Sequence, residues 1–128
     1  MSDMSSLIIY QRHYDLMIYS FPIVSRFPRD QRFVLGQQIQ NQMVEIGKML
    51  VHANKLKQKR GKLYEIDIEL EKLRLLLRLA KDLGLMSVKK YGHHCERTDE
   101  IGKLLGGWLK KVDPGYGVAR QAAPPGNQ

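Results

Sequence analysis

Two arginines, Arg74 and Arg78, lie one helical turn apart in the stretch LYEIDIELEKLRLLLRLAKDL, residues 63–83. At this spacing two like charges on a helix repel each other by about 0.2–0.5 kcal/mol. We therefore expect an anionic group to offset them. The phosphates of a nucleic acid would do so. Salt bridges to Asp67, Glu71 or acidic residues of a neighbouring subunit would also do so, because arginine at an interface is usually paired.

A denser group of positive charges precedes this stretch. It spans eight residues, contains no acidic residue and consists of Lys55, Lys57, Lys59, Arg60 and Lys62. Such a cluster is typical of phosphate-binding surface. It is equally typical of a solvated helix end, because Lys and Arg are favoured near the negative C-terminal end of the helix dipole. Both interpretations are kept as hypotheses.

Catalytic and metal-binding patterns are missing from the sequence. The four histidines, His13, His52, His93 and His94, include no pair with the i, i+4 spacing of a helical zinc site. Cys95 is the only cysteine, which excludes an intramolecular disulfide, and a nucleophilic pair with His94 would need a third orienting group and an open pocket. The run GKLLGGW lacks the Gly-Lys-Ser/Thr order of a phosphate loop. We therefore expect no catalytic residue, metal or cofactor, and no enzymatic activity.

The overall composition is that of one basic domain. The chain has 128 residues, of which 43% are hydrophobic, and its 21 Lys and Arg residues exceed its 13 Asp and Glu residues, giving a net charge of +8. A protein this basic attracts polyanions whatever its fold. No apolar run approaches the roughly 20 residues that span a bilayer, and the N-terminal MSDMSSLII does not resemble a signal peptide. With a single cysteine, these features predict a cytoplasmic protein without a membrane partner.

Four stretches of helical periodicity position these side chains. We expect helices at about residues 4–25, 29–57, 62–83 and 87–112, each with apolar residues spaced by three and four. The expected buried stripes are Leu7, Tyr10, Tyr14, Met17, Phe21 and Val24; Gly36, Ile39, Met43, Ile46, Leu50 and Ala53; Leu63, Ile66, Leu70, Leu73, Leu77 and Ala80; and Val88, Tyr91, Cys95, Thr98, Gly102, Leu105, Leu109 and Val112.

Proline, glycine and serine residues mark the ends of these helices. Pro22 predicts a kink or an early end in the first helix, and Pro28 predicts the start of the second. Gly84 fits the left-handed cap of the third helix and Ser87 the N-cap of the fourth. The Gly- and Pro-rich residues 113–128 have no apolar period and are predicted to be a disordered tail.

Four such helices with short connections predict an all-α fold, an antiparallel up-down-up-down four-helix bundle over residues 1–112. Some apolar residues lie outside the four stripes that a single bundle would bury. This surplus of apolar surface predicts a homo-oligomer. It consists of Ile68, Leu75 and Leu79 on the third helix and Trp108 on the fourth. Gly102, Gly106 and Gly107 each cost about 1 kcal/mol in a helix, which predicts close approach of another backbone or a large ring.

Three short motifs in this order carry a resemblance to a known family: FPR at residues 27–29, LRLLLRL at 73–79 and IGKLLGGW at 101–108. Over Tyr14 to about Lys111 the chain resembles the accessory variability determinant (Avd) proteins of diversity-generating retroelements. These belong to a broader family of four-helix bundles, which includes proteins encoded in the intervening sequences of bacterial 23S ribosomal RNA genes.

The resemblance implies a pentameric ring of bundles, encoded by a bacterium or a phage, that binds the retroelement's reverse transcriptase and nucleic acid. In such elements a template RNA is copied with errors at adenines, and the cDNA replaces a variable region of a target gene. The accessory protein has no active site, and Arg74 and Arg78 match arginines of the family's basic binding surface. The alternative is a structural or protein-interaction oligomer of the wider family that has no reverse transcriptase partner.

Overall fold

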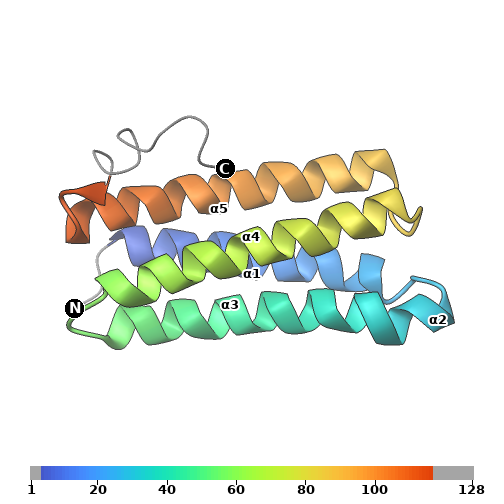
Figure 1. The fold of residues 1–128 in the computed structure, drawn as a ribbon, viewed down its shortest axis with the longest axis horizontal. Coiled ribbons are helices and arrows are strands. Elements are labelled where there is room, and N and C mark those ends of the chain that lie inside the picture. The colour runs from blue at the N-terminus through green and yellow to red at the C-terminus, as the bar shows by residue number, and fades with distance from the viewer. Residues whose placement is uncertain (1–3, 117–128) are drawn as a thin grey trace, which may run out of the picture.

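The computed structural model describes residues 4–116 of the 128-residue chain. Four long helices dominate it (Figure 1). A three-residue helix and a π-helical turn, η1, lie between the first two of them. In chain order the elements are α1 (Met4–Val24), α2 (Arg29–Gln31), η1 (Arg32–Gly36), α3 (Gln37–Lys55), α4 (Arg60–Asp82) and α5 (Val88–Val112).

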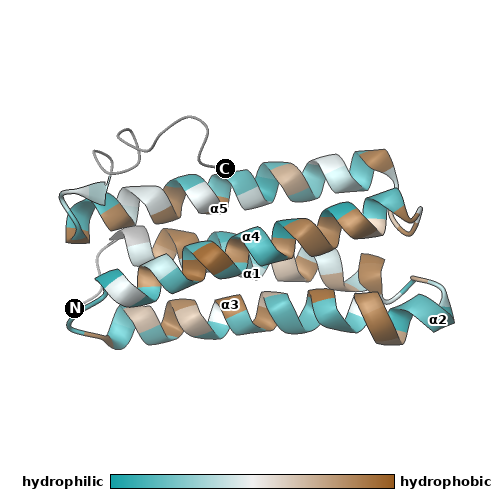
Figure 2. Cartoon of the chain, in the orientation of Figure 1, coloured by the Kyte–Doolittle hydropathy of each residue, from teal (hydrophilic) through white to brown (hydrophobic). Residues whose placement is uncertain are grey.

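The long helices form an antiparallel bundle. Successive helices run in opposite directions along one common axis (Figure 1). Helix α1 packs against α3 and α5, and α4 packs against the same two helices, which places α1 and α4 at diagonal corners. Apolar and polar residues alternate along every long helix, as expected of amphipathic bundle helices (Figure 2). The prediction of an up-down-up-down four-helix bundle is confirmed.

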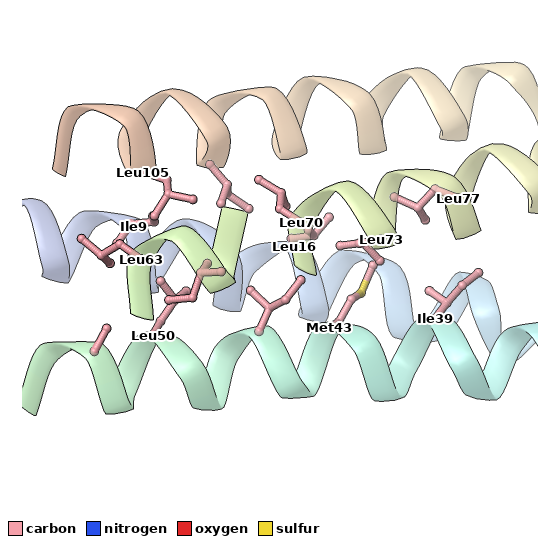
Figure 3. Packing of buried hydrophobic residues seen from close by; sticks show 14 of the residues in the cluster. Ile9, Leu16, Ile39, Met43, Leu50, Leu63, Leu70, Leu73, Leu77 and Leu105 are labelled. Carbon is pink, nitrogen blue, oxygen red and sulfur yellow. The ribbon is translucent and has the colours of Figure 1, made fainter. Parts of the chain in front are cut away.

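Helices α3 and α4 bury the stripes that their periodicity predicts. All six residues of each predicted stripe are buried, Gly36 being the last residue of η1. Figure 3 shows Leu70 and Leu73 of α4 near the side chains of Leu16 and Met43, and Leu77 further along the bundle on the side of Ile39. Their spacing of three and four keeps these residues on one side of each helix. Replacing one of the buried Leu, Ile or Met side chains by alanine typically costs about 2–5 kcal/mol, a large fraction of a total stability of about 5–15 kcal/mol.

Helix α1 departs from the prediction because polar residues line its buried side. Its buried side chains include Ser6, Ile9, His13, Leu16, Ser20 and Val24. The predicted stripe is therefore wrong at Leu7, Tyr10 and Tyr14, which are exposed. Burial of the polar residues is tolerated because they are bonded internally: His13 Nε2 donates to the Met43 carbonyl over 2.6 Å, and Ser20 Oγ lies 3.0 Å from His94 Nε2.

The buried side of helix α5 also differs from the predicted stripe, again because a buried polar residue takes an inward position. Its buried residues are His94, Thr98, Ile101, Leu105, Trp108 and Leu109. Val88 is exposed, and Tyr91 and Cys95 are only half-buried. His94 takes the inward position because its Nδ1 donates to the Lys90 carbonyl over 2.7 Å while its Nε2 accepts from Ser20.

The connection between α4 and α5 follows the predicted capping chemistry. Gly84 has a φ of 76°, and the amide of Leu85 donates to the carbonyl of Ala80 over 2.9 Å, the wider bond of a Schellman motif. Ser87 Oγ accepts from the amide of Lys90 over 3.1 Å, as an N-cap does. At the other turn, Pro22 lies in the last turn of α1, which ends two residues later.

Two predicted boundaries are wrong. The second helix does not run unbroken over residues 29–57, because η1 interrupts it and α3 ends at Lys55. The predicted disorder from residue 113 is also wrong for its first four residues. Asp113 accepts a hydrogen bond of 2.6 Å from Tyr64, and Tyr116 is buried with its ring centroid 5.9 Å from that of Tyr64. The rest of the predicted tail, 117–128, lies outside the described residues.

Candidate nucleic-acid interface

The basic cluster of residues 55–62 surrounds the connection between α3 and α4, at one end of the bundle (Figure 1). Lys59 is turned inward there. Its ammonium donates to the carbonyls of Ala53 and Asn54 over 3.1 Å each, and to that of Leu56. These carbonyls lie at and just beyond the C-terminus of α3, where the amides of a further helical turn are missing. For Lys59 these hydrogen bonds favour the helix-end interpretation over phosphate binding.

Two further cations of this cluster have acidic partners. The guanidinium of Arg60 lies 3.0 Å from the Asp113 carboxylate, and Lys62 lies 3.4 Å from Glu65. The hydrogen bond from Tyr64, followed by that from Arg60, holds the pKa of Asp113 below its usual range. Arg60 thus links the end of α5 to the start of α4, and Asp113 offsets its charge in part.

Lys55 and Lys57 differ from the rest of the cluster. Both are exposed, and neither takes part in a salt bridge within residues 4–116. An ammonium on a flexible stem at an exposed turn can reach a phosphate without first breaking an internal bond. Of the five cluster residues, these two are the ones available to an external anion.

Arg74 is a bridge between α4 and α5. Its Nη2 donates to the Thr98 carbonyl over 3.2 Å, and its Nη1 lies 3.2 Å from the Asp99 carboxylate. In a third contact, Nε of Arg74 lies 3.5 Å from the carboxylate of Glu71, which is on the same helix. Intramolecular acids therefore offset Arg74, as the ion-pair hypothesis predicts for Glu71 but with Asp99 as an additional partner.

Arg78 is the accessible member of the arginine pair. Its side chain is 72% exposed, against 35% for Arg74, and Asp82, at 3.7 Å, is its acidic partner among residues 4–116. An exposed i, i+4 pair at this distance contributes only about 0.3–0.5 kcal/mol. The structure thus separates two residues that the sequence presents as equivalent.

The glycines of α5 accommodate side chains rather than another backbone. A Cβ atom on Gly102 would lie 2.9 Å from Nη2 of Arg74, so Gly102 gives the arginine bridge its space. A Cβ atom on Gly106 would lie 3.7 Å from the hydroxyl of Tyr116, which fits the prediction of a nearby large ring. Gly107 has open space around its Cβ position, so the prediction of a close approach is wrong there.

Two separate faces of the bundle carry several exposed apolar residues each. One is the α4 strip, Ile68, Leu75 and Leu79, which lies opposite the buried stripe of α4, and its Leu75 is 67% exposed. Trp108, expected to add to this surplus, is only 3% exposed because it packs inside the single bundle. The second face, here called the α1–α3 face, is made by Leu7, Tyr10, Tyr14 and Ile18 of α1 with Val44 and Val51 of α3.

The α1–α3 face includes a shallow pocket. It has a volume of about 190 Å³ and is lined by residues of α1 and α3, among them Leu7, Tyr10 and Val51. The rings of Tyr10 and Tyr14 stack beside it with centroids 6.3 Å apart. Because α1 and α4 occupy diagonal corners of the bundle, this face and the α4 strip point away from each other.

The amino-acid sequence was compared with models of known protein families. A family model described as bAvd-like matches residues 7–112, which is most of the chain. The chain belongs to the bAvd-like family. A comparison with curated proteins gave no match.

A second basic region of this bAvd-like protein was missed by the sequence analysis. Arg26, Arg29 and Arg32 are exposed at the corner formed by α2 and η1, at the opposite end of the bundle from Lys55 and Lys57 (Figure 1). The missed signal is a spacing of three residues between the arginines around the FPR turn. Phe27, Pro28 and the acidic Asp30 interrupt this pattern, so no unbroken run of cations reveals it.

The half-buried Cys95 of the bAvd-like protein lies in a pocket of about 190 Å³ between α4 and α5, lined in part by Arg74, Tyr91 and Asp99. His94 cannot act as its base, because both ring nitrogens are bonded to Ser20 and to the Lys90 carbonyl. Among residues 4–116, no three His, Cys, Asp or Glu side chains are grouped so that they could hold a metal ion. Within the same residues, every helix is too short or too polar to cross a membrane.

Proposed function

We propose that this bAvd-like protein is a non-enzymatic accessory protein of a diversity-generating retroelement. In this role it binds the element's reverse transcriptase and its template RNA or cDNA through basic surface, and so supports mutagenic retrohoming. Membership of the bAvd-like family supports the proposal. The observation that carries it is the exposure of Lys55, Lys57 and Arg78 at positions where the bundle's own acids neutralise them weakly or not at all.

Phosphate binding by these cations has a measurable signature. Each phosphate that a cation neutralises releases condensed counterions, so affinity falls steeply as salt rises. The test is fluorescence anisotropy of the purified protein with the element's template RNA and with an unrelated RNA, at 50 and 200 mM salt. We expect salt-sensitive binding with little discrimination between the two RNAs, and capture of the reverse transcriptase in a pull-down.

A charge variant assigns the binding to the α3–α4 turn. Lys55→Gln with Lys57→Gln should weaken binding of both RNAs and reduce the salt dependence. Lys48→Gln, which removes an exposed cation from the middle of α3, is the matched control and should change little. Salt-independent binding, or none at low salt, would contradict the nucleic-acid role. A well-formed oligomer that binds neither RNA nor reverse transcriptase would favour the structural alternative.

Self-association is part of this proposal, and the two apolar faces support it. They lie on different sides of one bundle and differ in shape, since the α4 strip is a single row of aliphatic side chains, whereas the α1–α3 face combines two stacked tyrosines with a shallow pocket. Two different faces that fit each other give a heterologous contact, which closes into a ring when the rotation allows. We propose a homo-oligomeric ring built in this way, and the resemblance to Avd proteins suggests five subunits.

A further inference from the structure

The corner where α2 meets η1 displays an aromatic ring beside three cations. We define the α2–η1 corner as Arg26, Arg29, Arg32 and Phe33, all of which are exposed. The π-helical turn explains this arrangement. In an unbroken helix Arg32 would share the buried stripe of Gly36 and Ile39, but the extra residue of the wider turn rotates the preceding positions by about 100°.

The backbone of the corner is held firmly. Phe27 is 1% exposed and anchors the chain in the core just before α2. The amides of Gln31 and Arg32 both donate to the Pro28 carbonyl, over 2.9 and 2.8 Å. Nε of Arg32 donates to the Phe27 carbonyl over 3.3 Å. A fixed backbone lowers the conformational entropy that a bound ligand must remove.

The cations of the corner are free to bind an external anion. Within residues 4–116, none of the salt bridges involves Arg26, Arg29 or Arg32. Lys89 and Lys90, also exposed and without a salt bridge in that part of the chain, extend the positive charge at the same end of the bundle. A guanidinium matches the geometry of a phosphate group and can donate two hydrogen bonds to it.

Phe33 is the second, independent observation. Its side chain is 65% exposed, although the other two phenylalanines of the chain are buried or half-buried. The guanidinium carbon of Arg32 lies 6.0 Å from the centroid of its ring. An exposed ring among cations is the arrangement on which proteins stack the bases of single strands, since the cations follow the backbone and the ring receives a base.

We propose that the α2–η1 corner is a second nucleic-acid contact, which holds a single strand with its phosphates on Arg26, Arg29 and Arg32 and one base stacked on Phe33. This inference rests on the proposed function and adds a separate binding surface to it. The corner and the α3–α4 turn are separated by α3, whose 19 residues span about 30 Å. Each protomer thus offers nucleic acid two contacts, one at each end.

The role of the Phe33 side chain is tested with Phe33→Leu, which keeps an apolar side chain, and with Phe33→Trp, which keeps an aromatic stacking surface. The probes are a single-stranded uridine RNA, a single-stranded thymidine DNA and a duplex RNA of matched length, followed by anisotropy. We expect Phe33→Leu to weaken both single strands about 5- to 150-fold, the usual effect of losing one base–ring stack, and to leave the duplex unchanged. Phe33→Trp should bind like the wild type. Val34→Ala, at an exposed neighbouring apolar residue, is the control and should also bind like the wild type.

The arginines are tested with the triple variant Arg26→Gln, Arg29→Gln and Arg32→Gln. Three lost phosphate contacts should lower the slope of log affinity against log salt by about 2 for a single strand. The single substitution Lys48→Gln should lower it by no more than about 0.7. Thermal unfolding of each variant by circular dichroism confirms that the fold is kept.

The outcomes separate this inference from the function on which it rests. The proposal that the α2–η1 corner binds nucleic acid is overturned if Phe33→Leu and the triple variant both bind like the wild type while the double variant Lys55→Gln with Lys57→Gln binds more weakly. In that case the proposed function still stands. The proposal is also overturned if Phe33→Leu changes the oligomeric mass in light scattering without changing the affinity for single strands, because the Phe33 side chain then belongs to an interface between subunits. Absence of all binding by the wild type at low salt would overturn both.

Discussion

At the scale of single residues, two buried histidines give the bundle a sensitivity to acid. His13 and His94 are both inaccessible to solvent, and burial lowers the pKa of each below 6.5, with the hydrogen bonds to the Met43 and Lys90 carbonyls acting in the opposite direction. Both rings are therefore neutral in the folded protein at pH 7. Nδ1 of His13 has no hydrogen-bond partner among residues 4–116, so the N–H that forms when this atom is protonated would have no acceptor.

The first prediction concerns this acid sensitivity. Well above pH 6.5, the ordinary pKa of histidine, neither the folded nor the unfolded chain protonates these rings, and their contribution to stability is fully present. As the pH falls below 6.5 the unfolded chain takes up protons that the folded chain excludes. The free energy of unfolding should then fall by up to about 1.4 kcal/mol per pH unit for each histidine. Urea unfolding at intervals between pH 7.5 and 5 measures this slope.

Variants attribute the slope to particular rings. His94→Gln should lower the slope between pH 6.5 and 5 by about half, whatever its effect on stability at pH 7.5. His52→Gln, at an exposed position, is the control and should leave the slope unchanged. An equal slope in the wild type and His94→Gln would contradict burial of a neutral ring.

At the scale of elements, the predictions from sequence succeed where burial is decided by apolar residues alone. The stripes of α3 and α4 contain no polar side chain, so a spacing of three and four identifies them directly. In α1 and α5 the inward positions include His13, Ser20 and His94, whose burial depends on partners from other helices. Sequence spacing carries no information about those partners, and the predicted stripes are displaced as a result.

The same limit applies to the candidate binding residues. Sequence identifies all five cations of the α3–α4 turn but cannot distinguish Lys59, bonded to the end of α3, from Lys55, which faces solvent. It also cannot distinguish Arg74 from Arg78, because the partners of Arg74 on α5 are 24 and 25 positions away. The α2–η1 corner depends on a π-helical turn, for which the sequence has no comparable signature.

The arginine pair supports a prediction about the contact between α4 and α5. Arg74→Ala should lower the free energy of unfolding by about 1 kcal/mol, since it removes a partly exposed bridge to Thr98 and Asp99. Arg78→Ala should change it by less than about 0.5 kcal/mol but weaken binding of RNA or reverse transcriptase, because its guanidinium is exposed. Denaturant unfolding and anisotropy on the two variants compare these effects. Equal losses of stability would contradict the distinction drawn between the two arginines.

At the scale of the whole molecule, exposed cations without salt bridges among residues 4–116 lie at both ends of the bundle, and the two apolar faces lie along its sides. Lys55 and Lys57 are at one end, and Arg26, Arg29 and Arg32 are at the other (Figure 1). The α4 strip and the α1–α3 face run along different sides. Side-by-side assembly would therefore cover the apolar faces and leave both basic ends accessible, so oligomer formation and nucleic-acid binding need not compete.

This arrangement predicts the behaviour of a mixture of two interface variants. Leu75→Glu places a charge on the α4 strip, and Tyr14→Glu places one on the α1–α3 face, so each variant alone should be monomeric. Each variant retains the face that the other has lost, and an equal mixture should therefore form a dimer that grows no further. Light scattering gives the masses. Val88→Glu, at an exposed residue outside both faces, is the control and should assemble like the wild type.

The mixing experiment also distinguishes the two kinds of symmetry. An isologous dimer uses the same patch on both subunits, so one substitution would disrupt it and the mixture would not restore it. A mixture that stays monomeric, or a Leu75→Glu protein with the mass of the wild type, would contradict the proposed ring contact.

The clamp formed by Arg60, Tyr64 and Asp113 holds the end of α5 against the start of α4, and α1 begins at the same end of the bundle (Figure 1). Met4 and Tyr116, the first and last described residues, therefore lie at the end of the bundle that carries Lys55 and Lys57. A surface anchor coupled directly at either of these two residues would screen that end and leave the α2–η1 corner facing the solution, so sensor-based affinities would differ from those measured in free solution.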